Sequence, residues 1–77
     1  MRLGVVIIKF NGGANSRPVV FYDAFIEMND GCLICVHQVK RGVSHAYRYE
    51  PNEINTMVIL PGDRLASEVE QIRKALS

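Results

Sequence analysis

Short apolar or alternating runs, separated by turn residues, occupy most of this chain. Runs that are rich in β-branched and aromatic residues and bounded by Gly, Pro, Asn or Asp are typical of β-strands. The pattern predicts strands at residues 3–10, 19–28, 32–39, 43–49 and 56–60. We interpret residues 1–77 as one small domain, because a chain of this length has room for a single core.

The end of the chain changes from a strand period to a helix period. Apolar residues recur there at the spacing of one helix face: Leu65, Val69, Ile72 and Leu76. This stripe predicts a helix over residues 64–76, with Asp63 as its N-cap, that packs the four side chains against the sheet.

Two glycine-containing turns predict how the middle strands pair. We expect Asn29-Asp30-Gly31 and Lys40-Arg41-Gly42 to be three-residue hairpin loops. The first loop then pairs Met28 with Cys32, Ile26 with Ile34, and Phe25 with Cys35. The second loop pairs Val39 with Val43, His37 with His45, and Cys35 with Tyr47.

The predicted fold is α+β, mostly β: a small five-stranded antiparallel SH3-like or Sm-like barrel, or a curled sheet, with one C-terminal helix. The second strand is long, and Asp23-Ala24 is the point where we expect it to bend, so that it serves both halves of the sheet. Residues 47–60 resemble the end of SH3-like and Sm-like barrels, where a strand leads through a single turn into a short closing strand. Sm-like proteins usually carry their helix before the barrel, whereas this helix follows it.

The predicted pairing divides the side chains between two faces. One face is nearly all apolar and is the expected core: Ala24, Ile26, Met28, Cys32, Ile34, Val36 and Ala46. The other face mixes aromatic and titratable groups: Phe21, Asp23, Phe25, Glu27, Cys35, His37, His45, Tyr47 and Tyr49. Aromatic residues and arginine often dominate binding energy, so we predict that this second face and its basic rim contact a partner. The predicted partner-binding residues are Phe21, Phe25, His37, Lys40, Arg41, His45, Tyr47, Arg48 and Tyr49.

The cysteines and histidines do not form a convincing catalytic or metal motif. Cys32 and Cys35 are three positions apart on a predicted strand, so their side chains point to opposite faces and we expect no bond between them. His37, His45 and Cys35 have the chemistry of zinc ligands, but no fourth ligand is evident. Catalysis by Cys35 would need an activated thiolate and an oxyanion hole. We therefore expect no enzyme activity, no metal and no cofactor.

The net charge of the chain limits the classes of partner that we expect it to bind. The formal net charge is +1, far below what a general nucleic-acid coat protein carries. The leading hypothesis is a small non-enzymatic interaction or regulatory protein that binds a macromolecule, most plausibly a protein; such domains are frequent among phage and mobile-element inhibitors of host systems. A first alternative is a small barrel that binds RNA or single-stranded nucleic acid. A second is an oligomer that sequesters a nucleotide or metabolite near Tyr47, Arg48 and Gly12-Gly13.

Location and assembly follow from the same composition. No segment approaches the ~20 apolar residues that cross a bilayer, and unpaired thiols favour a reducing compartment, so we expect a cytoplasmic protein. We also expect a homo-oligomer, most simply a dimer. Twofold strand pairing or face-to-face docking would hide the apolar faces of the strands and the first strand, which we expect to be an exposable edge.

Overall fold

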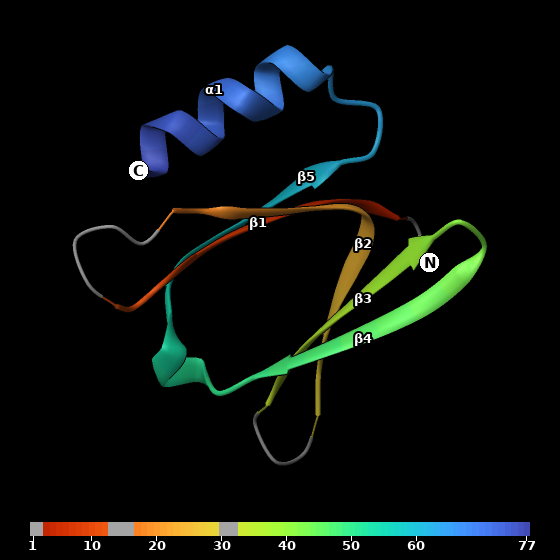
Figure 1. Ribbon diagram of the computed structural model, residues 1–77, viewed down its shortest axis with the longest axis vertical. Coiled ribbons are helices and arrows are strands. Elements are labelled where there is room, and N and C mark those ends of the chain that lie inside the picture. Colours follow the sequence, from red (N-terminus) through yellow and green to blue (C-terminus); the bar gives the residue numbers. More distant parts are fainter. Residues whose placement is uncertain (1–2, 13–16, 30–32) are drawn as a thin grey trace.

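The protein is described by a computed structural model, which covers residues 3–12, 17–29 and 33–77. Its strands are β1 (Gly4–Phe10), β2 (Val19–Met28), β3 (Ile34–Lys40), β4 (Val43–Tyr49) and β5 (Ile54–Pro61). A 3-10 turn, η1 (Pro51–Glu53), joins β4 to β5, and helix α1 (Ala66–Leu76) follows β5. The strands form a single antiparallel sheet in the order β4-β3-β2-β1-β5 (Figure 1). The predicted mostly β class, with five antiparallel strands and a C-terminal helix, is confirmed.

Strand β2 bends sharply and so belongs to both halves of the sheet. Gly4 pairs with Ala24 and Val6 pairs with Phe21. The chain therefore advances three residues on β2 where it advances only two on β1. Such an extra residue is a β-bulge, and Asp23 within it has φ 51°. The first half of β2 pairs with β1 and the second half with β3, and this change of neighbour curls the sheet (Figure 1). The bend expected at Asp23-Ala24 is confirmed.

The curl encloses one apolar cluster, which we call the interior. Its buried members come from three strands: Val6, Ile8, Phe21, Ala24 and Val36. A second cluster lies on the opposite side of β1, where Val69 of α1 packs against Val5 and Ile7. The helix thus covers one side of β1 and the interior covers the other (Figure 1).

The sheet does not close into a barrel. Its two ends are β4 and β5, and neither strand pairs with the other. Strand β1, expected as an exposed edge, instead lies between β2 and β5, and the side chains of Val5 to Ile8 are at most 3% exposed. That prediction was wrong because β5 returns along β1 and covers its free side.

Several element boundaries differ from the sequence-based prediction. Strand β5 begins at Ile54 rather than residue 56, because η1 is only one turn long. The helix begins at Ala66, and its N-cap is Leu65 rather than Asp63. Leu65 is 64% exposed, so it does not belong to the buried stripe, whereas Ile72 and Leu76 pack beside Val69 as predicted. Strand β3 begins at Ile34, and the predictions for Cys32 fall outside the described residues.

In the part of the chain that the structure describes, no helix is long and apolar enough to cross a membrane.

We predict that Val69→Asp lowers the free energy of unfolding by about 3 kcal/mol or more, because the fully buried carboxylate would have no partner. Leu65→Asp is the matched control, because it introduces the same charge at an exposed position of the stripe that the sequence predicted. It should leave stability unchanged or raise it by about 0.5–1 kcal/mol, because aspartate is a better N-cap than leucine. Urea denaturation followed by circular dichroism measures both. Equal losses in the two variants would contradict this placement of the helix.

Candidate functional site

The turn between β3 and β4 decides which side chains face the interior. Lys40 pairs with Val43, so only Arg41 and Gly42 form the loop, with φ values of 54° and 76°. Two consecutive residues at positive φ are typical of the type I′ turn, whose twist suits a two-residue hairpin. The predicted three-residue loop is therefore wrong, and a slip of one residue exchanges the two faces of β4.

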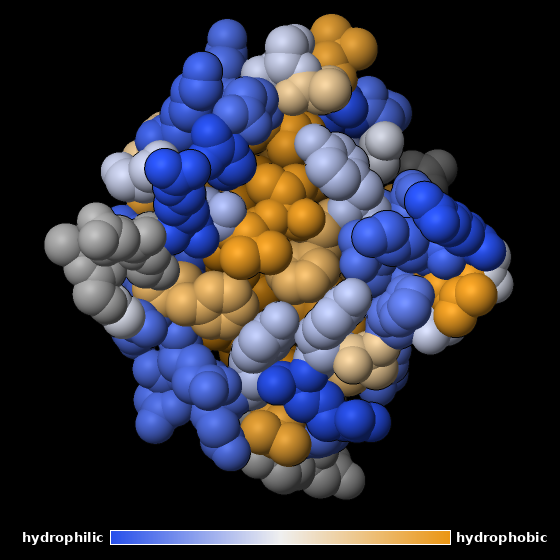
Figure 2. All heavy atoms as spheres, in the orientation of Figure 1, coloured by the Kyte–Doolittle hydropathy of each residue, from blue (hydrophilic) through white to orange (hydrophobic). Residues whose placement is uncertain are grey.

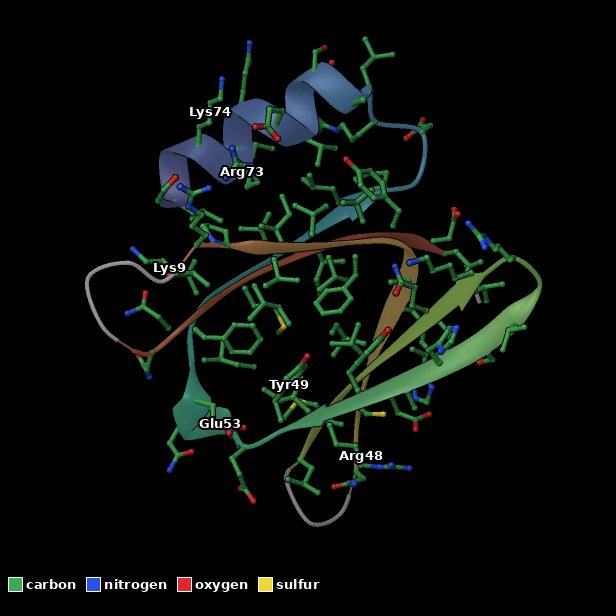
Figure 3. All side chains as sticks on the ribbon, viewed as in Figure 1. Lys9, Arg48, Tyr49, Glu53, Arg73 and Lys74 are labelled. Carbon is green, nitrogen blue, oxygen red and sulfur yellow. The ribbon has the colours of Figure 1, made fainter. Side chains whose placement is uncertain are left out.

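The tyrosines of β4 consequently line the interior instead of an outer surface. Tyr47 pairs with Val36, and its ring lies 5.3 Å from the ring of Phe21. Tyr49 pairs with Ile34 and lies 4.9 Å from Phe10. Figure 3 shows Tyr49 pointing into the curl of the sheet and Arg48 pointing away from it. Both tyrosines are half-buried, and Figure 2 shows apolar side chains reaching the surface at the centre of this view, framed by hydrophilic ones.

The pairing of β2 with β3 differs from the prediction by two residues, which preserves the faces. Met28 pairs with Ile34 and Phe25 with His37, whereas the prediction paired Phe25 with Cys35. The rings of Phe25 and His37 stack at 4.7 Å on the outer face of β3. Nε2 of His37 lies 3.4 Å from Oε1 of Glu27. This nitrogen is buried and makes no hydrogen bond with any described residue.

The predicted single working face is thus divided between two sides of the sheet. The interior side holds Phe21, His45, Tyr47 and Tyr49, whereas the outer side holds Phe25, His37 and Arg48. Phe21 is only 6% exposed, because the bulge at Asp23 turns it inward. A role for these residues in partner binding stays a prediction, but Tyr47→Ala now removes a core contact and no longer tests binding alone.

Three cations of the β3–β4 hairpin remain exposed and without a counter-ion. Lys40, Arg41 and Arg48 form no ion pair in the described ranges. The helix differs, because Arg64 pairs with Glu68 at 3.1 Å and Arg73 pairs with Glu70 at 2.5 Å. Strand β4 is also an unpaired edge that is exposed over most of its length. The hairpin therefore combines open backbone donors and acceptors with positive charge.

The two histidines lie on opposite sides of the sheet and do not share a ligand position. His37 pairs with Ala46, and His45 pairs with Gln38, so the imidazoles project to opposite sides of the sheet. Among the described residues, no group of three His, Cys, Asp or Glu side chains is placed to hold a metal ion. Cys35 is a buried, free cysteine. In the sheet register it lies opposite Glu27 of β2 and Arg48 of β4.

An asparagine network ties the start of the β1–β2 loop to η1. Nδ2 of Asn11 donates to the carbonyl of Asn52 at 2.8 Å, and its backbone N–H donates to the carbonyl of Glu53 at 2.7 Å. Nδ2 of Asn55 donates to Oδ1 of Asn11 at 3.3 Å. The contacts join residues about forty positions apart. Their turn-forming residue types were visible in the sequence, but their meeting depends on β1 pairing with β5.

An open groove of about 860 Å³ lies where β2 bends past the end of β5. It is lined mostly by apolar residues from three separate segments: Leu3, Phe25, Ile26, Ile59, Leu60 and Pro61. No sequence pattern indicated this groove, because its walls meet only through the curl of the sheet.

The surroundings of Tyr49 shift the pKa of its phenol. Burial of the phenol raises the pKa above its ordinary value of 10.0, and the nearby Tyr47 and Glu53 raise it further. Each of these causes disfavours the phenolate and so favours the neutral phenol of Tyr49 at the interior.

Comparison of the chain with protein-family models, curated proteins and solved structures finds no match.

We predict that Arg41→Asn raises the free energy of unfolding by about 0.5–1 kcal/mol. Arginine is held at positive φ in this turn, and Asn-Gly is the preferred dipeptide of a type I′ turn. Thermal denaturation measures the change, with Arg48→Asn as the control that removes the same charge from a strand residue. A lower melting temperature for Arg41→Asn would contradict the two-residue turn.

We also predict a loss of stability above pH 10 that depends on Tyr49. Since folding raises the pKa of this phenol, its contribution is complete below the ordinary value of 10.0 and is lost as the pH rises through the folded-state pKa. Tyr49→Phe should flatten this alkaline decline when denaturant midpoints are compared between pH 9 and 11. Tyr22→Phe, which makes the same substitution at an exposed position, is the matched control.

Proposed function

We propose that this protein is a non-enzymatic interaction protein and that it binds an extended, acidic segment of another protein along the β4 edge. The observation that carries the proposal is the free β4 edge together with Lys40, Arg41 and Arg48, which form no ion pair with any residue that the structure describes. A strand edge offers main-chain hydrogen bonds to an added strand, and basic side chains beside it favour a partner with carboxylates.

The side chains around this edge suit such a partner. Val43 and His45 are exposed on the interior side of β4, and Ala46 and Arg48 are exposed on its outer side. An added strand would place its alternate side chains against these two sets. The small side chain of Ala46 leaves room on the outer side, where Arg48 supplies charge.

The topology supports assignment of the fold to the SH3-like small barrels in an opened form. The strand order, the bent β2 and the single 3-10 turn between β4 and β5 agree with that architecture. Such frameworks host many unrelated functions, so the assignment adds a scaffold for binding and does not select the partner.

We predict that Arg48→Ala weakens partner binding by about 1–3 kcal/mol, the usual scale for an interface anchor, while the melting temperature changes little. Arg41→Asn should weaken binding as well, although it stabilises the fold, because it removes a charge from the same edge. Arg17→Ala is the matched control, since it removes one exposed arginine charge outside β4.

The measurement is fluorescence anisotropy with short acidic peptides of extended sequence, followed by quantitative affinity capture with the same variants. Peptide binding that falls with added salt and with Arg48→Ala supports the proposal. Equal binding by wild type and Arg48→Ala contradicts it. Binding of single-stranded oligonucleotides in place of peptides would favour the nucleic-acid alternative, and a small molecule released on denaturation would favour sequestration.

A further inference from the structure

Strand β5 forms the other open edge of the sheet, and its character differs from that of β4. Residues 54–62 carry no charged side chain, and most of them are β-branched or apolar. Natural proteins usually protect an exposed edge with charges, proline or a bulge. The only proline in β5 is Pro61, at its last position, so the length of the strand is left open to pairing.

An exposed apolar side chain marks this edge as a contact surface. Ile59 pairs with Val6, which lies in the interior cluster, so Ile59 projects to the interior side, yet it is 58% exposed. It also forms part of the wall of the apolar groove together with Leu3 and Pro61. A strand added beside β5 would remove Ile59 from water.

We propose that the occupant of this edge is a second copy of the chain, paired antiparallel through β5 about a twofold axis. A surface that binds its own copy must be complementary to itself, and an uncharged strand meets this condition because no like charges come to face each other. The pairing joins the two curled sheets into one continuous sheet.

The charges around α1 are complementary under this twofold arrangement. Lys9 lies beside Thr56 near the start of β5, and Lys74 is in the last turn of α1 at the same end of the molecule (Figure 3). Asp63 lies past the other end of β5, just before the helix. None of the three forms an ion pair in the described ranges, although the charge of Lys74 helps to lower the pKa of Glu70 on the same helix. An antiparallel pair brings the lysine end of each copy beside the Asp63 end of the other.

The spacing of the two helices also permits the arrangement. Helix α1 packs over β1, so β5 and its copy lie between the two helices. The two copies of β1 would be three inter-strand spacings apart, because β5 and its copy lie between them. The axes of the helices above them would then be roughly 14 Å apart, which is wider than the 8–10 Å between packed helices. The helices therefore do not collide, and long side chains such as Lys74 are able to span the gap. Glu53 of η1 directly precedes β5, and its carboxylate accepts a hydrogen bond from the backbone N–H of Glu50 (Figure 3).

The first test is the mass of the protein in solution, measured by light scattering and sedimentation over a wide range of concentrations. We expect wild type to have twice the chain mass and Ile59→Lys to have the mass of a single chain. Val43→Lys is the matched control, since it places the same charge at a β-branched position on the other edge with 56% exposure. It should remain dimeric. A wild type that stays monomeric at all concentrations, or a dimer that only Val43→Lys disrupts, overturns the proposal.

The second test uses charge reversal and does not depend on how Ile59→Lys folds. Lys74→Glu and Asp63→Lys should each raise the dimer dissociation constant between about 2-fold and 30-fold, since the twofold axis doubles each exposed contact. The double variant should recover much of this loss. Absence of recovery would exclude the antiparallel arrangement. Because Arg48→Ala leaves β5 unchanged, loss of partner binding and loss of the dimer are separate results.

Discussion

The extra residue in β2 is the constraint on which the rest of the structure depends. With Asp23 at positive φ, the strand turns away from β1 and continues beside β3. The turn also rotates Phe21 onto the same side as Ala24, so aromatic and aliphatic side chains from both halves of the sheet meet in the interior. Without the bulge, Phe21 would face the opposite side and the two halves would have no shared core.

The second decisive feature is the two-residue turn at Arg41-Gly42. It sets the register of β4 and thereby places Tyr47 and Tyr49 inside, with Arg48 outside. The cost is an arginine at positive φ, a conformation that non-glycine residues adopt reluctantly. Arg41 therefore stands in a strained conformation at the tip of a basic, exposed hairpin.

Because the sheet stays open, the molecule has two free edges of opposite character. The β4 edge is accompanied by cations that have no ion pair within the described part of the chain, and the β5 edge carries no charged side chain along its length. The first suits a partner with complementary charge, and the second suits a copy of itself. The helix leaves both edges free because it packs over β1, in the middle of its half of the sheet.

The sequence by itself determined the elements, since apolar periodicity and turn residues are local properties. It defined β2 and β4 to the residue, placed the bend at Asp23, and identified Val69, Ile72 and Leu76 as a buried stripe. The tertiary structure decided the register of β4, the central position of β1 and the exposure of Leu65. One residue more or less in a turn reverses the faces of a strand, and the alternation of side chains is compatible with either result. The groove and the two open edges likewise arise only from contacts between segments far apart in the chain.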